Sequence, residues 1–135
     1  MNLSVPAVLL YSLAGASIIA YLPVPVMAYA RAKVGFDLAA PRALFDKLPD
    51  YGKRATWAHA NSFESLIIYI AAVLVAYLAD VDTPSVAWAA LVYLLARLLY
   101  VLFYIFNVAV GRSLMFGIGL FCTISLFVAG FMGLN

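Results

Sequence analysis

The chain has 135 residues, of which 67% are hydrophobic and 10% are charged, and its formal net charge is +2. A soluble domain usually has about 25% charged residues, and a small globule has too little interior to bury so much apolar surface. The composition therefore excludes a soluble enzyme and a disordered chain, argues against nucleic-acid binding, and predicts an integral membrane protein.

Long uncharged stretches predict four membrane-spanning helices, since a helix needs about 20 apolar residues to cross a bilayer. The first span is expected over residues 5–30, and Pro23 and Pro25 should bend its second half. A loop over residues 31–55, rich in Pro, Gly, Asp and Lys, follows it. The remaining spans are expected at residues 56–78, 85–108 and 113–133, joined by short turns.

The whole chain, residues 1–135, is thus predicted to be one all-α domain, an up-down-up-down four-helix bundle in the membrane. The first span is expected to be retained and not cleaved as a signal peptide, because the basic residues follow its apolar stretch. Ala72 and Ala76 have the small-xxx-small spacing of a close helix contact. Cys122 is the single cysteine and cannot form an internal disulfide.

The basic residues are concentrated on one side of the predicted bundle. Six of the eight Lys and Arg residues lie in the loop over residues 31–55, and Arg112 lies in the turn over residues 107–112. The turn between the second and third spans has Asp80 and Asp82 and no basic side chain. The positive-inside rule therefore predicts that both basic loops are cytoplasmic and both termini are outside. A bacterial inner membrane is the expected location, with the endoplasmic reticulum as the alternative.

Glu64 and Arg97 are charged residues inside predicted spans. A charge at the bilayer centre costs about 2.5–3.5 kcal/mol on insertion scales, so such residues usually face the bundle interior and have a partner. Both residues lie about ten residues from the basic side of their spans, which is roughly 15 Å deep. The matched depths predict that Glu64 and Arg97 pair, either to fix helix packing or as part of a polar site.

On each of two spans, three side chains at helical spacing share a face: Trp57, Asn61 and Glu64 on the second span, and Arg97, Tyr100 and Tyr104 on the third. Buried amide and hydroxyl groups need hydrogen-bond partners, so these faces predict an amphiphilic pocket that opens toward the basic loops. The alternative for the two tyrosines is a place in the aromatic belt of the membrane interface. His59 has no Cys or His cluster around it, so a structural or interfacial role is expected rather than metal binding.

These residues resemble the signatures of the MAPEG family (membrane-associated proteins in eicosanoid and glutathione metabolism). Residues 54–64, which read Arg-Ala-x-x-Ala-x-x-Asn-x-x-Glu, resemble the second-helix signature of that family. The segment Ala96-Arg97-x-x-Tyr100-x-x-x-Tyr104, followed by Arg112-Ser113, resembles its third-helix signature and the start of its fourth helix. The resemblance covers the whole chain. It implies a homotrimer with active sites between neighbouring subunits, which conjugates glutathione to lipophilic electrophiles or reduces lipid hydroperoxides with it.

The resemblance also implies roles for individual residues, with glutathione as co-substrate. Asn61 and Glu64 would contact glutathione, and Glu64 would hold its amino group. The other implied contacts are Arg31, toward a glutathione carboxylate, and Arg54, Arg97, Tyr100 and Tyr104. The expected partners are membrane lipid, further copies of the chain and a lipophilic small molecule, and no metal, flavin or haem is expected.

Arg112 would be the catalytic residue, with Ser113 as a hydroxyl donor. A thiol has an ordinary pKa of about 8.5, and a guanidinium beside it favours the nucleophilic thiolate. The N-terminus of the fourth span would add the positive end of its dipole at the same place. The alternative for Arg112 is a plain anchor on the positive side of the membrane.

The chain departs from the family pattern at Trp57, because many glutathione-using members have an arginine four residues before the asparagine. A tryptophan cannot bind a carboxylate, and Arg54, one turn earlier, is the candidate substitute. The spacing from Tyr104 to Arg112 also differs by one residue from some members. Three functions therefore stay open: a thiol-dependent enzyme, a non-catalytic scaffold or lipid-binding trimer, and a small transporter that uses the buried Glu64–Arg97 pair.

Overall fold

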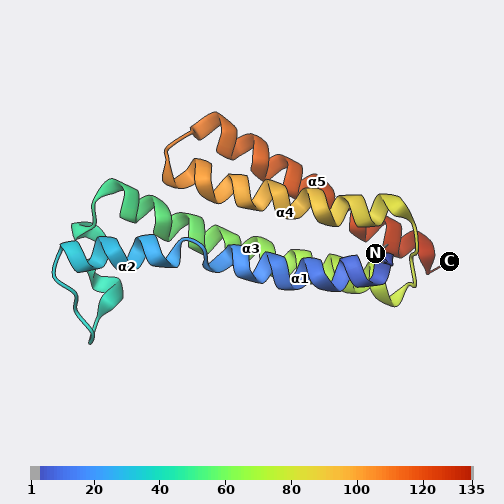
Figure 1. Ribbon diagram of the computed structural model, residues 1–135, viewed down its shortest axis with the longest axis horizontal. Coiled ribbons are helices and arrows are strands. Elements are labelled where there is room, and N and C mark those ends of the chain that lie inside the picture. The colour runs from blue at the N-terminus through green and yellow to red at the C-terminus, as the bar shows by residue number, and fades with distance from the viewer. Residues whose placement is uncertain (1–3, 135) are drawn as a thin grey trace.

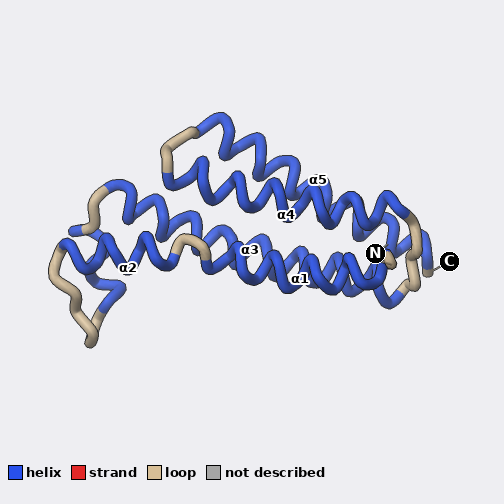
Figure 2. The backbone as a smooth tube through the Cα atoms, in the orientation of Figure 1, coloured by secondary structure: helices blue, strands red, loops and turns tan. Residues whose placement is uncertain are grey.

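The computed structural model describes residues 4–134, and every regular element in that range is a helix (Figures 1 and 2). The elements are α1 (Val5–Tyr21), α2 (Val24–Lys33), the 3-10 helix η1 (Pro41–Lys47), α3 (Asp50–Leu78), α4 (Pro84–Ile105) and α5 (Ala109–Gly133). Four segments of the described chain are long and apolar enough to cross a membrane: α1 with α2, α3, α4 and α5. The predicted all-α membrane four-helix bundle is confirmed.

The chain runs up-down-up-down, so the described ends of the chain lie beside the turn between α3 and α4 (Figure 1). The opposite end of the bundle holds the loop between α2 and α3 and the turn between α4 and α5. We call it the basic end, because seven of the eight Lys and Arg residues lie there, within residues 31–54 and at Arg112. Helices α3 and α4 form the inner pair, and both α1 and α5 pack against the two of them.

The first predicted span is divided into α1 and α2 at Leu22 and Pro23. Proline has no N–H to donate and its ring clashes with the preceding turn, so Pro23 and Pro25 together break the helix instead of only bending it. The last carbonyls of α1 therefore lose their helical partners. The ring nitrogen Nδ1 of His59 on α3 donates to the Ala20 carbonyl at 2.8 Å. His59 thus has a structural role, since it holds the broken span against α3.

The other helices differ from the expected spans mainly at the basic end. Helix α3 begins at Asp50, six residues before the expected start of its span, and α5 begins at Ala109 instead of residue 113. Lys, Arg and Ala are good helix formers, so a helix continues past the apolar run that hydropathy detects. Helix α4 ends at Ile105, because Asn107 adopts a left-handed conformation with φ of 63°.

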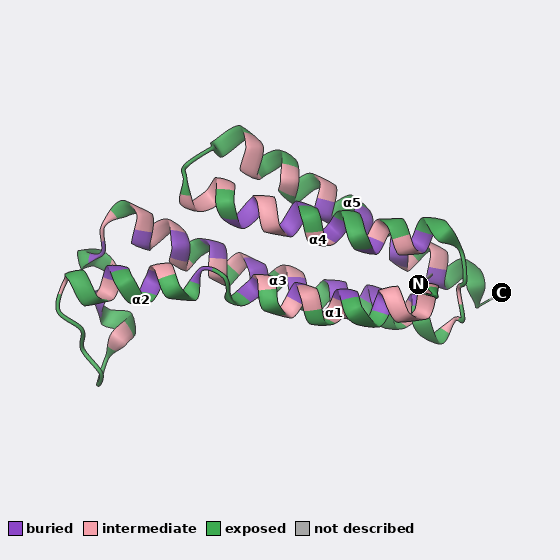
Figure 3. Ribbon diagram, viewed as in Figure 1, coloured by how far each residue is buried: buried purple, intermediate pink, exposed green. Residues whose placement is uncertain are grey.

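Buried residues lie on the faces that the helices turn toward one another (Figure 3), and several of them are small. Ala72 and Ala76 of α3 are fully buried, as expected from their spacing. Gly130 of α5 lies so close to α3 that an added Cβ would be 2.8 Å from the backbone nitrogen of Ala76 and 2.7 Å from a methyl group of Val75. Such contacts let backbones meet without the hydrophobic effect, which is absent between helices in lipid.

Two stacked tyrosines connect three helices in the half of the bundle away from the basic end. The rings of Tyr69 on α3 and Tyr93 on α4 are parallel, with centroids 3.6 Å apart. The Tyr69 hydroxyl donates to Ser12 Oγ on α1 at 2.7 Å, and that oxygen donates to the Leu9 carbonyl at 2.6 Å. Because lipid offers no hydrogen-bond partners, this chain of bonds keeps both buried hydroxyls satisfied and fixes how α1, α3 and α4 face one another.

The close contact at Gly130 gives a stability prediction. Gly130→Ala places a methyl group against the backbone of α3, and overpacking of this kind typically costs about 1–3 kcal/mol. Gly117→Ala on the same helix is the matched control, because nothing lies within 4 Å of its added Cβ. Unfolding in mixed micelles with increasing detergent should show a lower midpoint for the first variant alone. Equal midpoints would contradict the close approach of α5 to α3.

Candidate functional site

Arg97 is buried on the inner face of α4, with 3% of its surface exposed. Its Nη2 donates to Asn61 Oδ1 and to Ser62 Oγ of α3, both at 3.2 Å. Its guanidinium carbon lies 4.2 Å from the ring centroid of Tyr100. The cation is therefore stabilised by two neutral oxygens and by the negative face of an aromatic ring.

The predicted ion pair between Glu64 and Arg97 does not form within the described chain. Glu64 is exposed and makes neither a hydrogen bond nor an ion pair with residues 4–134. The depths match as expected, but Arg97 is bonded to Asn61 and Ser62 instead. Glu64 lies three residues after Asn61, about 60° around the helix, and lines an open hollow with Asn61 and Tyr104 of α4.

Two guanidinium groups with two tyrosine rings between them form a series that runs from Arg97 toward the basic end. The ring of Tyr100 meets that of Tyr104 edge to face, with centroids 5.5 Å apart. The guanidinium carbon of Arg112, in the first turn of α5, lies 4.5 Å from the centroid of Tyr104. We call these four residues of α4 and α5 the ladder: Arg97, Tyr100, Tyr104 and Arg112.

A shallow, open hollow with a volume of about 440 Å³ lies beside the ladder. We call it the Glu64 hollow, and it is lined by Trp57, Ala60, Asn61, Glu64 and Tyr104. The Glu64 carboxylate lies on one wall, and Tyr104 on the other wall carries Arg112 on its face. Arg112 is not among the residues that line the hollow, and it is connected to it through the ring of Tyr104.

Trp57 covers the end of the Glu64 hollow near the η1 loop. Its ring packs on Phe45 of η1, with centroids 5.7 Å apart, and 47% of its surface is exposed. It contributes apolar area and an indole N–H donor at the position where the family pattern has a guanidinium.

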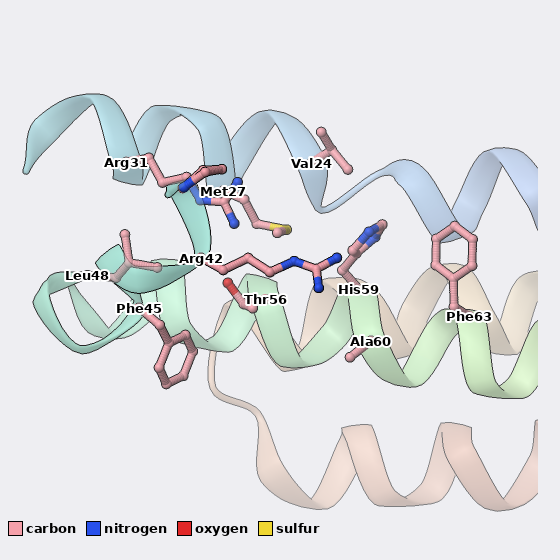
Figure 4. Close-up of a pocket in the computed structure, with 11 residues that line it drawn as sticks. Val24, Met27, Arg31, Arg42, Phe45, Leu48, Thr56, His59, Ala60 and Phe63 are labelled. Carbon is pink, nitrogen blue, oxygen red and sulfur yellow. The ribbon is translucent and has the colours of Figure 1, made fainter. Parts of the chain in front are cut away.

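Two of the expected ligand residues lie away from the Glu64 hollow. Arg54 Nε donates to the Ile105 carbonyl at 3.0 Å, so its guanidinium holds the C-terminus of α4 against α3. Arg31 lines a second pocket between α2, η1 and α3 (Figure 4).

Six of the expected residues are connected by contacts or by the hollow that they line: Asn61, Glu64, Arg97, Tyr100, Tyr104 and Arg112. Ser113 is exposed beside Arg112 at the start of α5.

Ser62 and Tyr93 contribute to the surroundings of Arg97 without having been predicted from the sequence. Ser62 is a buried acceptor for Arg97, and Tyr93 lies one turn before it on α4. Positions 93, 97, 100 and 104 are spaced by four, three and four residues, so they share a face. That spacing was the available signal for Tyr93, whereas nothing in the sequence distinguishes Ser62 from Ser65.

A family model described as the MAPEG family matches residues 8–132. The chain belongs to the MAPEG family. The match includes every residue of the ladder and of the Glu64 hollow. MAPEG proteins include glutathione transferases and peroxidases as well as other members. Comparisons with curated proteins and with solved structures gave no match.

The serine that accepts from Arg97 gives a second stability prediction. Ser62→Ala removes a buried acceptor of a charged donor, and the expected loss is about 1–3 kcal/mol. Ser65→Ala, one turn further along α3, is the matched control, since its hydroxyl makes no hydrogen bond in the described chain. Detergent-induced unfolding, followed by the helical circular dichroism signal, measures both. If the two variants unfold alike, Ser62 does not stabilise Arg97.

Proposed function

We propose that this MAPEG protein is a glutathione-dependent transferase or peroxidase in the membrane, which acts on lipophilic electrophiles or lipid hydroperoxides. The observation that carries the proposal is the ladder, which holds Arg112 over Tyr104 at the edge of the Glu64 hollow. Arg112 also lies in the first turn of α5, where the helix dipole favours an anion. A thiolate bound at this point would be stabilised by a guanidinium and by a helix N-terminus.

The Glu64 hollow offers matching groups for the two ends of glutathione. The Glu64 carboxylate, which forms no ion pair with residues 4–134, would accept hydrogen bonds from the amino group of the γ-glutamyl residue. Asn61 accepts from Arg97 through Oδ1, so its amide N–H groups remain available to donate to a glutathione oxygen. Arg97 would thus orient Asn61, while Tyr100 and Tyr104 line the path toward Arg112.

In the proposed transferase reaction, the thiol of glutathione loses its proton and the sulfur forms a bond to an electrophilic carbon. The leaving group departs with its electron pair. In the proposed peroxidase reaction, the sulfur attacks a peroxide oxygen, the O–O bond breaks and an alcohol leaves after protonation. A second glutathione then reduces the resulting sulfenic acid, which gives a disulfide and water. In both reactions Arg112 stabilises the thiolate before the attack.

The position of Glu64 supports a site that is completed by another copy of the chain. An exposed carboxylate in the middle of a spanning helix would face hydrocarbon in a monomer, which is costly. A neighbouring subunit that packs over the Glu64 hollow would remove it from lipid. We therefore propose the homotrimer of the family as the working assembly, with a lipophilic substrate entering from the bilayer.

Trp57 favours a second candidate function, a non-catalytic scaffold or lipid-binding trimer. The indole adds apolar surface to the Glu64 hollow where a carboxylate of glutathione would need a cation. Arg54 is not among the residues that line the hollow, and its Nε is bonded to the Ile105 carbonyl. In this alternative the ladder serves only to stabilise the buried Arg97.

The primary experiment measures turnover of the purified protein with a model aryl halide and a lipid hydroperoxide, with and without glutathione. Arg112→Gln should lower the turnover number about 10²–10³-fold, because one donor to a developing anion is lost. Its pH profile should move to higher pH, where the thiolate forms without the guanidinium. Lys47→Gln, which removes an exposed charge from η1, is the control with unchanged turnover. Absence of thiol-dependent turnover in the unmodified protein would contradict an enzymatic function.

The substitution Trp57→Arg tests whether the Glu64 hollow is a glutathione site. A guanidinium at this position can bind a carboxylate, so the dissociation constant for glutathione should fall by about tenfold. Trp57→Gln removes the ring without adding charge and is the matched control. Equilibrium dialysis with labelled glutathione measures all three proteins. Saturable binding in the Arg variant alone would support the non-catalytic alternative for the natural chain.

A further inference from the structure

A second pocket, with a volume of about 700 Å³, lies at the basic end between α2, η1 and the first turns of α3 (Figure 4). Its polar lining residues are Arg31 of α2, Arg42 of η1, and Thr56 and His59 of α3. No acidic side chain is among the described residues that line it. We call it the Arg31–Arg42 pocket.

The two arginines of this pocket lack an anionic partner in the described chain. Arg31 Nε is buried and has no hydrogen-bond partner, which is unusual because buried N–H groups are nearly always paired. Arg42 extends from η1 across the pocket toward His59 without forming an ion pair with residues 4–134 (Figure 4). Two guanidinium groups thus converge on a space that contains nothing to neutralise them.

The donor hydrogens of the other two polar residues in the pocket are already used. The Thr56 hydroxyl donates to the Gly52 carbonyl at 2.9 Å, and His59 Nδ1 is bonded to the Ala20 carbonyl at 2.8 Å. The N–H groups of Arg31 and Arg42 are therefore the free donors in this pocket. A guanidinium presents its donors in a planar fork that matches the oxygens of a phosphate or a carboxylate.

Polarity changes along the depth of the pocket. Arg31 and Thr56 lie nearer the basic end, whereas Val24 and Phe63 lie seven residues deeper on the same two helices. Seven residues correspond to about 10 Å of helix, which is the distance from a head group into the hydrocarbon. The cationic part of the pocket therefore lies at head-group level, and the apolar part lies at the level of acyl chains.

We propose that the Arg31–Arg42 pocket binds the phosphate of an anionic phospholipid, with one acyl chain along Val24 and Phe63. Basic pockets between spanning helices on the positive side of a membrane protein are suited to such head groups. Of the residues that line it, the pocket shares Ala60 alone with the Glu64 hollow, so the lipid site goes beyond the proposed thiol chemistry. It assigns Arg31 to lipid and not to glutathione.

The test is native mass spectrometry of the protein in detergent, titrated with phosphatidylglycerol or with phosphatidylcholine of the same acyl chains. Phosphatidylglycerol should bind at least about tenfold more tightly. The double variant Arg31→Gln/Arg42→Gln should weaken its binding about thirtyfold, as expected for two charges near a membrane surface. The matched control Lys33→Gln/Lys47→Gln removes the same charge from two exposed positions outside the pocket and should change binding less than about threefold.

Three results would overturn the proposal: equal binding of the two lipids, equal losses in the two double variants, or saturable binding of inorganic phosphate or glutathione that Arg31→Gln abolishes and phosphatidylglycerol does not displace. The elution volume and circular dichroism of each variant establish that it is folded. If the double variant does not fold, Arg42→Gln alone replaces it, because Arg42 is exposed, and it should weaken binding about fivefold. The lipid titrations contain no thiol, so their outcome is independent of the proposed enzyme activity.

Discussion

A single buried guanidinium constrains the inner part of this bundle. Arg97 lies within a spanning helix, where neither water nor lipid can solvate a cation, and no carboxylate of the described chain pairs with it. Its stabilisation comes from the Asn61 and Ser62 oxygens and from the ring of Tyr100. These contacts require α3 and α4 to meet in one register and one rotation.

Because Arg97 is stabilised by neutral groups, the carboxylate of Glu64 remains available to bind a ligand. If the two charges had paired inside the bundle, the Glu64 hollow would hold no free carboxylate, and its groups could not distinguish a zwitterionic ligand from a neutral one. Because Arg97 has neutral partners, the carboxylate remains on the wall of the hollow. The second cation of the ladder, Arg112, stacks on Tyr104, which lines the same hollow. The oxygens of Asn61 and Ser62 stabilise Arg97, and the carboxylate of Glu64, further along α3, belongs to the proposed ligand site.

The sequence predicts how far along the membrane normal each residue lies, but it does not predict which neighbouring helix or pocket its side chain faces. Uncharged runs and the asymmetry of Lys and Arg predict the spans and the basic end, because hydropathy reports position along the membrane normal. The rotation of a helix depends on long-range contacts, here the stack of Tyr69 on Tyr93 and the approach of Gly130 to Ala76. For this reason Glu64 was expected to pair with Arg97, whereas the structure places it beside Asn61 on the wall of the Glu64 hollow.

The same limit explains why the residues expected around glutathione divide between two pockets. Arg31 faces the direction set by the break at Pro23 and by the fold of η1 over α3, and neither follows from helical spacing. On α3, neighbouring residues line different pockets. Thr56 and Phe63 line the Arg31–Arg42 pocket, whereas Trp57, Asn61 and Glu64, each next to a residue of that pocket, line the Glu64 hollow. Ala60 lines both.

A shift of one residue turns a side chain by about 100° around a helix, so two turns of α3 can present a basic, amphiphilic pocket on one face and a carboxylate on the other. The basic groups of the Arg31–Arg42 pocket come from α2 and η1, and α3 supplies Thr56 and His59 opposite them. His59 lines this pocket and also bonds the Ala20 carbonyl at the proline break, so one side chain of α3 connects the pocket to the end of α1.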